Sequence, residues 1–151
     1  MFLYGKLAAD AVAAMSYLAE EPARRAGSAE IARVRRISKP LAAKVLTRLA
    51  AAGWVEGTPG PGGGYRLAKA PSRIRLIRIV ELFEQTRTPS VCPFGRHWCG
   101  HRDPCPLHDA ITDLQDRNRR FLEETTLAVF ARGPVPTRRP GARAAAPGGG
   151  R

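Results

Sequence analysis

A run of glycine and proline between two β-prone segments constrains the fold of this chain more than any other stretch. The segments are Trp54 to Glu56 and Tyr65 to Leu67, and the loop between them reads GTPGPGGG. This composition is typical of a turn between paired strands. The loop lacks the Gly-Lys-Ser/Thr ending of a nucleotide-binding loop and joins two strands rather than a strand and a helix, which disfavours a nucleotide site. The sequence therefore predicts a β-hairpin.

Helices are predicted ahead of this hairpin. The first has apolar residues at helical spacing and is expected to stop before Pro22. The second is expected to run from Ala29 to Arg35 after an N-cap at Ser28, with Ile31 and Val34 facing the core. A connection of only a few residues then leads to the next helix.

A third helix is predicted after a break at Arg36 and Ile37. Ser38 is its expected N-cap, and Gly53 ends it because glycine readily takes the left-handed conformation found there. Two short helices joined by a tight turn form a helix-turn-helix, and the hairpin that follows makes it a winged helix. A further helix, capped by Ser72 and running to Phe83, completes the core. The predicted fold class is thus mainly α with a small β-hairpin.

The charge of the chain favours a polyanionic partner. The net charge is +12, the isoelectric point is about 11.0, and the first 78 residues carry fourteen Lys and Arg against five Asp and Glu. A winged helix with this charge is expected to bind double-stranded DNA, with its third helix in a major groove and its wing along the phosphates. The alternative is a solvated basic face on a helical bundle. The predicted DNA contacts are Ser28, Arg35, Arg36, Ser38, Lys39, Lys44 and Arg48, with Arg66 and Lys69 on the wing.

All three cysteines and all three histidines lie within CPFGRHWCGHRDPCPLH, residues 92–108. Thiolates select zinc, Cu(I) or iron–sulfur clusters, so Cys92, Cys99 and Cys105 with His108 suit either a Cys3His zinc site or a cluster. His97 and His101 are expected to be solvent-exposed. A catalytic thiol is disfavoured because nothing in the sequence supplies a substrate pocket, and no catalytic residue or enzyme activity is predicted.

The SAEIA segment with its following turn, the wing GPGGGYRLAKAP and the three spaced cysteines together resemble the IscR and NsrR family of winged-helix transcription regulators, in the Rrf2 superfamily. The resemblance covers about residues 1–130. It implies a homodimeric repressor that binds a palindromic operator. It also implies a [2Fe-2S] or [4Fe-4S] cluster that responds to nitric oxide, oxygen or redox state, or iron–sulfur supply. Matching the family's ligands places three of them at Cys92, Cys99 and Cys105. The fourth matches either His108 or, from the partner subunit, Asp10.

The last helix is predicted to pair two copies of the chain. Apolar residues recur at three-four spacing from residue 107 to residue 131, and a small domain has no core left for them. The expected organisation is a DNA-binding domain over residues 1–85, a cluster-binding loop over 86–106, a dimerisation helix over 107–131 and a disordered basic tail over 132–151.

The expected location is the cytoplasm. The odd cysteine count disfavours a disulfide framework, and the apolar N-terminal stretch is interrupted by Lys6 and Asp10, so neither a signal peptide nor a membrane span is predicted.

Overall fold

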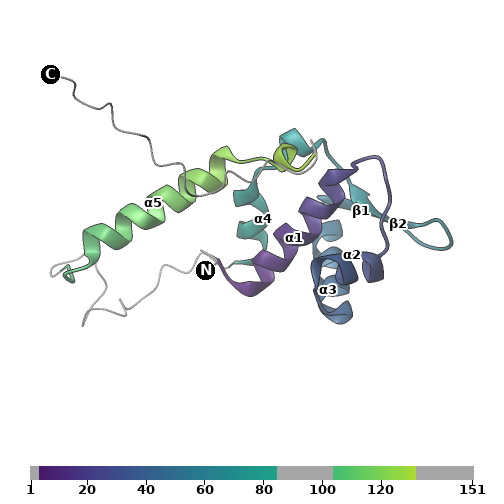
Figure 1. Ribbon diagram of the computed structural model, residues 1–151, viewed down its shortest axis with the longest axis horizontal. Helices are drawn as coiled ribbons and strands as arrows, with labels where there is room; N and C mark the ends of the chain where they lie inside the picture. The colour runs from purple at the N-terminus through teal and green to yellow at the C-terminus, as the bar shows by residue number, and fades with distance from the viewer. Residues whose placement is uncertain (1–3, 85–103, 132–151) are drawn as a thin grey trace, which may run out of the picture.

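A computed structural model of the protein describes residues 4–84 and 104–131. The chain is mainly helical and carries one two-stranded antiparallel sheet, as predicted (Figure 1). The elements in chain order are α1 (Lys6–Glu20), α2 (Ser28–Arg35), α3 (Lys39–Ala51), β1 (Val55–Thr58), β2 (Gly64–Leu67), the 3-10 turn η1 (Pro71–Arg73), α4 (Leu76–Phe83), α5 (His108–Glu124) and the 3-10 turn η2 (Leu127–Val129).

The core forms around α1, which packs against α2, α3 and α4. Apolar side chains at helical spacing on these helices are buried from water against one another. This burial supplies the main driving force for the packing of the helices. The largest fully buried side chains are Met15, Ile31, Val45, Leu46, Leu49, Ile74, Ile79 and Leu127.

The predicted ends of α2 at Arg35 and of α4 at Phe83 are confirmed, as are both boundaries of α3, but the starts of α2 and α4 differ from the prediction. Ser38 is the N-cap of α3, and Gly53 follows the helix with a φ of +72°, both as predicted. The N-cap of α2 is Gly27, so Ser28 is the first helical residue instead of the cap. Ser72 lies within η1, and α4 begins only at Leu76, because the 3-10 turn intervenes.

The inward orientation predicted for Val34 is wrong. Its side chain is 42% exposed, whereas Ile31, one turn earlier on α2, is fully buried. Helix α2 is only eight residues long and ends at Arg36, which has a left-handed φ of +54°. Ile31 and Ala32 are the buried residues of this short helix, and Val34 lies outside its core-facing side.

The hairpin is anchored to the start of the helix-turn-helix. Its strands pair Val55 with Leu67 and Gly57 with Tyr65, so each strand extends further toward the turn than predicted. Ala26, just before α2, exchanges two backbone hydrogen bonds with Tyr65, at 2.9 and 2.8 Å. The wing and the N-terminus of α2 therefore form one connected unit.

Helix α5 is shorter than the predicted helix over residues 107–131. It ends at Glu124, and the backbone becomes extended at Thr125. The carbonyl of Thr125 accepts a hydrogen bond from Leu76 N at 2.9 Å, and Leu127 N donates one to Ile74 O at 2.9 Å. Because Leu127 is fully buried in the same core as residues of α1, α3 and α4, the end of this segment belongs to that core and not to a separate helix.

An apolar stripe on α5 remains exposed. Leu114 and Phe121 are 48% and 56% exposed, while Leu122 is buried against the core. Among residues 4–84 and 104–131, no helix is long and apolar enough to cross a membrane.

Candidate nucleic-acid interface and cysteine segment

The outer face of α3 is exposed and basic. The helix buries Ala42, Val45, Leu46 and Leu49 against the core, which turns Lys44 and Thr47 outward. Ser38 and Lys39 are also exposed at its N-terminal end. Lys39 and Lys44 form no ion pair with the part of the chain that the structure describes. Both ammonium groups are thus available to an external anion.

Three arginines predicted at this face differ in their surroundings. Arg35 forms an ion pair with Glu20 and lies over the ring of Tyr17, with its guanidinium carbon 5.4 Å from the ring centroid. Arg48 lies over Phe83 at 5.1 Å. These contacts hold α2 on α1 and α3 on α4, whereas Arg36 is exposed in the turn.

Two arginines surround one carboxylate of the wing, one from the hairpin itself and one from the connection before α2. Arg66 pairs with its cross-strand neighbour Glu56, and Arg25 approaches the same Oε1 at 3.4 Å. Arg25 was not predicted from the sequence, since only the folded hairpin brings Glu56 close to it. Lys69 lies over the ring of Trp54, with Nζ 4.4 Å from the centroid.

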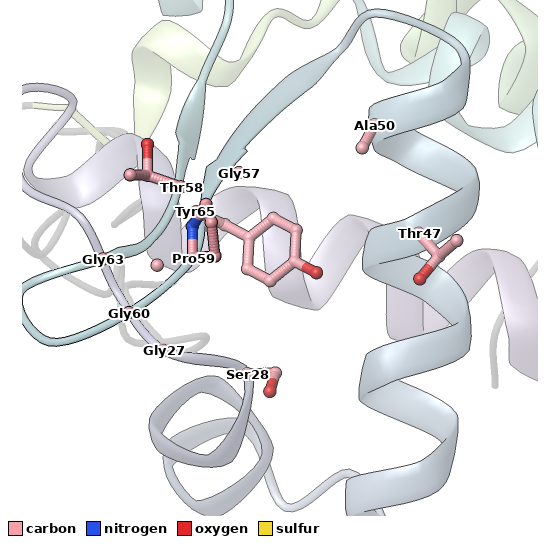
Figure 2. Close-up of a pocket in the computed structure, with 11 residues that line it drawn as sticks. Gly27, Ser28, Thr47, Ala50, Gly57, Thr58, Pro59, Gly60, Gly63 and Tyr65 are labelled. Carbon is pink, nitrogen blue, oxygen red and sulfur yellow. The ribbon is translucent and has the colours of Figure 1, made fainter.

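A groove of about 600 Å³ separates the wing from α3. Figure 2 shows the Tyr65 ring reaching into it from the hairpin with its hydroxyl directed toward α3, while Ser28 and Thr47 border the groove from α2 and α3. The rest of the lining consists of glycines together with Ala50, Thr58 and Pro59.

A hydrogen-bonded cluster fixes the first turn of α2. The Tyr17 hydroxyl donates to Glu30 Oε1 at 2.6 Å, and Arg24 Nη2 donates to the same oxygen at 2.6 Å. The hydrogen bonds from Tyr17 and then Arg24 lower the pKa of Glu30 below its ordinary value of 4.5. The hydrogen bond to Glu30 likewise raises the pKa of Tyr17.

Replacing Glu30 with glutamine is expected to lower Tm at neutral pH by about 3 °C, because the charge-assisted bond to Arg24 is lost. A lowered folded-state pKa stabilises the protein above the ordinary value of 4.5 and ceases to do so as the pH falls through the lowered pKa. The Tm difference from wild type should therefore shrink below pH 4.5. Thermal melts from pH 7 to pH 3 measure it. Glu123→Gln, which breaks an exposed pair on α5, is the control; an equal and pH-independent loss for both variants would contradict this account.

The structure brings together two of the candidate metal ligands. Cys105 is buried, at 9% exposure, and its carbonyl accepts a hydrogen bond from His108 N at 2.9 Å, where α5 begins. His108 is half-buried. Cys92 and Cys99 lie outside the described residues, as do His97 and His101. A thiol and an imidazole one turn apart are a donor set suited to zinc or to a cluster.

Asp10 lies elsewhere. It is on α1, where its Oδ2 is 2.8 Å from Lys6 Nζ and its side chain is 13% exposed. Figure 1 shows the first turns of α5 projecting beyond the other helices, away from α1. One chain therefore does not place Asp10 beside Cys105. Within residues 4–84 and 104–131, no three Cys, His, Asp or Glu side chains gather as a metal site.

Comparison with known proteins points to one group. The family model described as "Rrf2: Iron-dependent Transcriptional regulator" matches residues 5–133. A putative HTH-type transcriptional regulator of Aquifex aeolicus is 34% identical over 119 residues, which cover 78% of this chain and 83% of the relative. The HTH-type transcriptional regulator IscR of Pectobacterium carotovorum is 32% identical over 99 residues, 66% of this chain and 60% of IscR.

Solved structures show the same fold. T. potens IscR superposes with a TM-score of 0.65 at 22% identity, over 84% of each chain. CymR, described as the global cysteine regulator of B. subtilis, gives a TM-score of 0.69 at 22% identity and covers 87% of this chain and 98% of CymR. Both likenesses establish the winged-helix architecture.

Proposed function

Because the chain belongs to the Rrf2 family of transcriptional regulators, we propose that it represses transcription by binding a palindromic operator as a homodimer. We further propose that an iron–sulfur cluster, held through the cysteine segment, controls this binding. The stimulus in this proposal is nitric oxide, oxygen or redox state, or iron–sulfur supply.

The observation that carries the DNA-binding part is the unpaired basic face of α3 beside the wing. Lys39 and Lys44 are exposed on the helix that follows the tight turn, and Ser38 caps it. A helix presented in this way can enter a major groove while the adjacent hairpin follows the phosphate backbone. Arg36 in the turn is the further contact we assign to DNA. Arg35, Arg48 and Arg66 stay further proposed contacts, although each already has a partner within the protein.

The residues we assign to the cluster are Cys92, Cys99 and Cys105, with His108 as fourth ligand. The support for His108 is its place one turn after the buried Cys105. Asp10 is the alternative, contributed by the partner subunit, but its carboxylate is already paired with Lys6. When bound, an iron–sulfur cluster supplies redox-active iron whose ligation responds to small oxidants and nitric oxide. A structural Cys3His zinc site without sensing is the competing assignment.

The connection from the ligands to the DNA-binding face runs along α5. Its first residue is His108, and its other end is pinned to the core by the backbone bonds of Thr125 and Leu127. The exposed Leu114 and Phe121 on the same helix are the surface that we propose for the second subunit. A shift at the ligands would thus alter the spacing of two α3 helices, which must match half-sites about 34 Å apart.

The test of this proposal is the metal content of anaerobically purified protein. We expect iron and acid-labile sulfide together with broad visible absorption, and operator affinity that changes when the cluster is removed. One zinc per chain in a colourless protein would instead establish the structural zinc site and contradict the sensing function.

Replacing His108 with alanine is expected to shift the visible absorption of the cluster, because an imidazole ligand is lost from iron. The same spectrum should stay unchanged in His97→Ala, the control for a nearby histidine that is not assigned as a ligand. Asp10→Asn is measured alongside. A shift for Asp10→Asn and none for His108→Ala would transfer the fourth ligand to the partner subunit's α1.

A further inference from the structure

The groove between α3 and the wing combines hydrogen-bond donors from three elements. We propose that it seats one stretch of the operator's sugar–phosphate backbone and that the hydroxyls of Ser28, Thr47 and Tyr65 bind a phosphate there. This inference rests on the proposed function and adds to it a phosphate site that contains no charged side chain.

The three hydroxyls are available to a ligand. Ser28 opens α2, Thr47 lies in the middle of α3, and Tyr65 lies on β2. Figure 2 shows all three side chains around the same space. None of them donates or accepts a hydrogen bond within the described part of the chain. Three hydroxyls without protein partners at one groove are free to donate to an external acceptor.

The chemistry of the lining fits a phosphodiester. The groove has no carboxylate on its walls, so nothing there repels an anion. Hydroxyl groups donate well to phosphate oxygens, and the first turn of a helix such as α2 adds unpaired backbone N–H groups and a partial positive charge. The Glu30 carboxylate in that turn bonds Tyr17, Arg24 and the backbone of Gly27, and its side chain does not line the groove.

The location of the groove matches the path of a DNA strand. A duplex that contacts both Lys44 on α3 and the hairpin must carry a backbone across the space between them. The volume of about 600 Å³ exceeds a single phosphate group and suits a length of sugar–phosphate chain.

The hairpin holds Tyr65 in place for this contact. Its cross-strand partner is Gly57, and a Cβ added at Gly57 would lie 3.1 Å from Cε1 of the Tyr65 ring. The backbone of Tyr65 is bonded to Ala26 on the other side. The ring therefore lies across a glycine surface with its hydroxyl directed at α3.

Replacing Tyr65 with phenylalanine tests the inference, since the ring stays and only the hydroxyl is removed. We expect operator affinity to fall roughly fivefold to tenfold, and affinity for an unrelated duplex to fall equally, because phosphate contacts carry no sequence information. The salt dependence of binding should not change, because no charge is lost. Thr47→Val should behave alike. Thr112→Val, which removes an exposed hydroxyl on α5, is the control expected to bind as wild type.

Duplexes with a single neutral methylphosphonate linkage locate the contact. At one position along the operator, the neutral linkage should weaken the binding of the wild-type protein. At that same position it should not lower the affinity of Tyr65→Phe below its affinity for the unmodified operator. Unchanged affinity of Tyr65→Phe, while Lys44→Ala binds more weakly, would overturn this inference and leave the proposed function standing. Unchanged affinity of both variants would overturn the proposed function as well. A loss confined to the operator would assign Tyr65 to base recognition and overturn the phosphate site.

Discussion

Cys105→Ser is expected to lose nearly all iron and acid-labile sulfide while keeping the helical content of the wild-type protein. Serine has almost the same size as cysteine, but its oxygen is a hard ligand that binds iron in clusters poorly. Cys105 is buried immediately before α5, so its removal leaves two thiolates and one imidazole for the cluster. With one thiolate fewer in the proposed ligand set, we expect the cluster to dissociate.

The measurement combines visible absorption, iron and sulfide assays and far-ultraviolet circular dichroism on anaerobically purified protein. Ser16→Ala removes a buried polar side chain from α1 and is the control for a small internal change, with full iron content expected. Two results would contradict the assignment of Cys105. One is an iron content equal to that of the wild-type protein. The other is that the variant unfolds and that added zinc restores the helicity of the wild-type protein, because the site would then be structural.

Lys44→Ala is expected to weaken operator binding roughly tenfold to hundredfold, the range for losing one direct contact in a major groove. Lys44 is exposed on the outer face of α3 and has no ion pair with the described residues, so its removal should not affect folding. If the ammonium contacts a phosphate, the slope of affinity against salt concentration falls by about one. Cofactor content should be unchanged, because α3 is remote from the start of α5 (Figure 1).

Fluorescence anisotropy with a labelled operator at several salt concentrations measures both quantities. Arg120→Ala is the charge-matched control, since it also removes one exposed cation but does so on α5. Equal losses for the two variants would indicate a general effect of net charge. Wild-type affinity of Lys44→Ala would remove this face of α3 from the interface.

Local patterns predicted most of the fold because they act over a few residues. Ser38 and Gly53 bound α3 as expected, and the glycine-rich loop forms the hairpin. Predictions failed where a distant segment intervened. The last helix ends at Glu124 because the chain must return Leu127 to a core made by residues far earlier in the sequence.

The candidate site shows the same division. Residue type and spacing alone identified the basic face of α3 and the cysteines with His108, because charge and soft donor atoms are properties of single side chains. The partners of these charged side chains depend instead on the folded structure. Arg35 looked like a DNA contact but pairs with Glu20, fifteen residues away, and Arg66 is held by Glu56 across the hairpin.

The sequence by itself thus determined the winged-helix class and the family, and it supplied the candidate residues of both proposed sites, since each depends on local composition and spacing. Only the tertiary structure decided that Arg35 is paired with Glu20, that Arg25 reaches Glu56, and that Ser28, Thr47 and Tyr65 border one groove. The physical reason is that a side chain's partners are set by packing between segments distant in the sequence, and local propensity contains no information about those contacts.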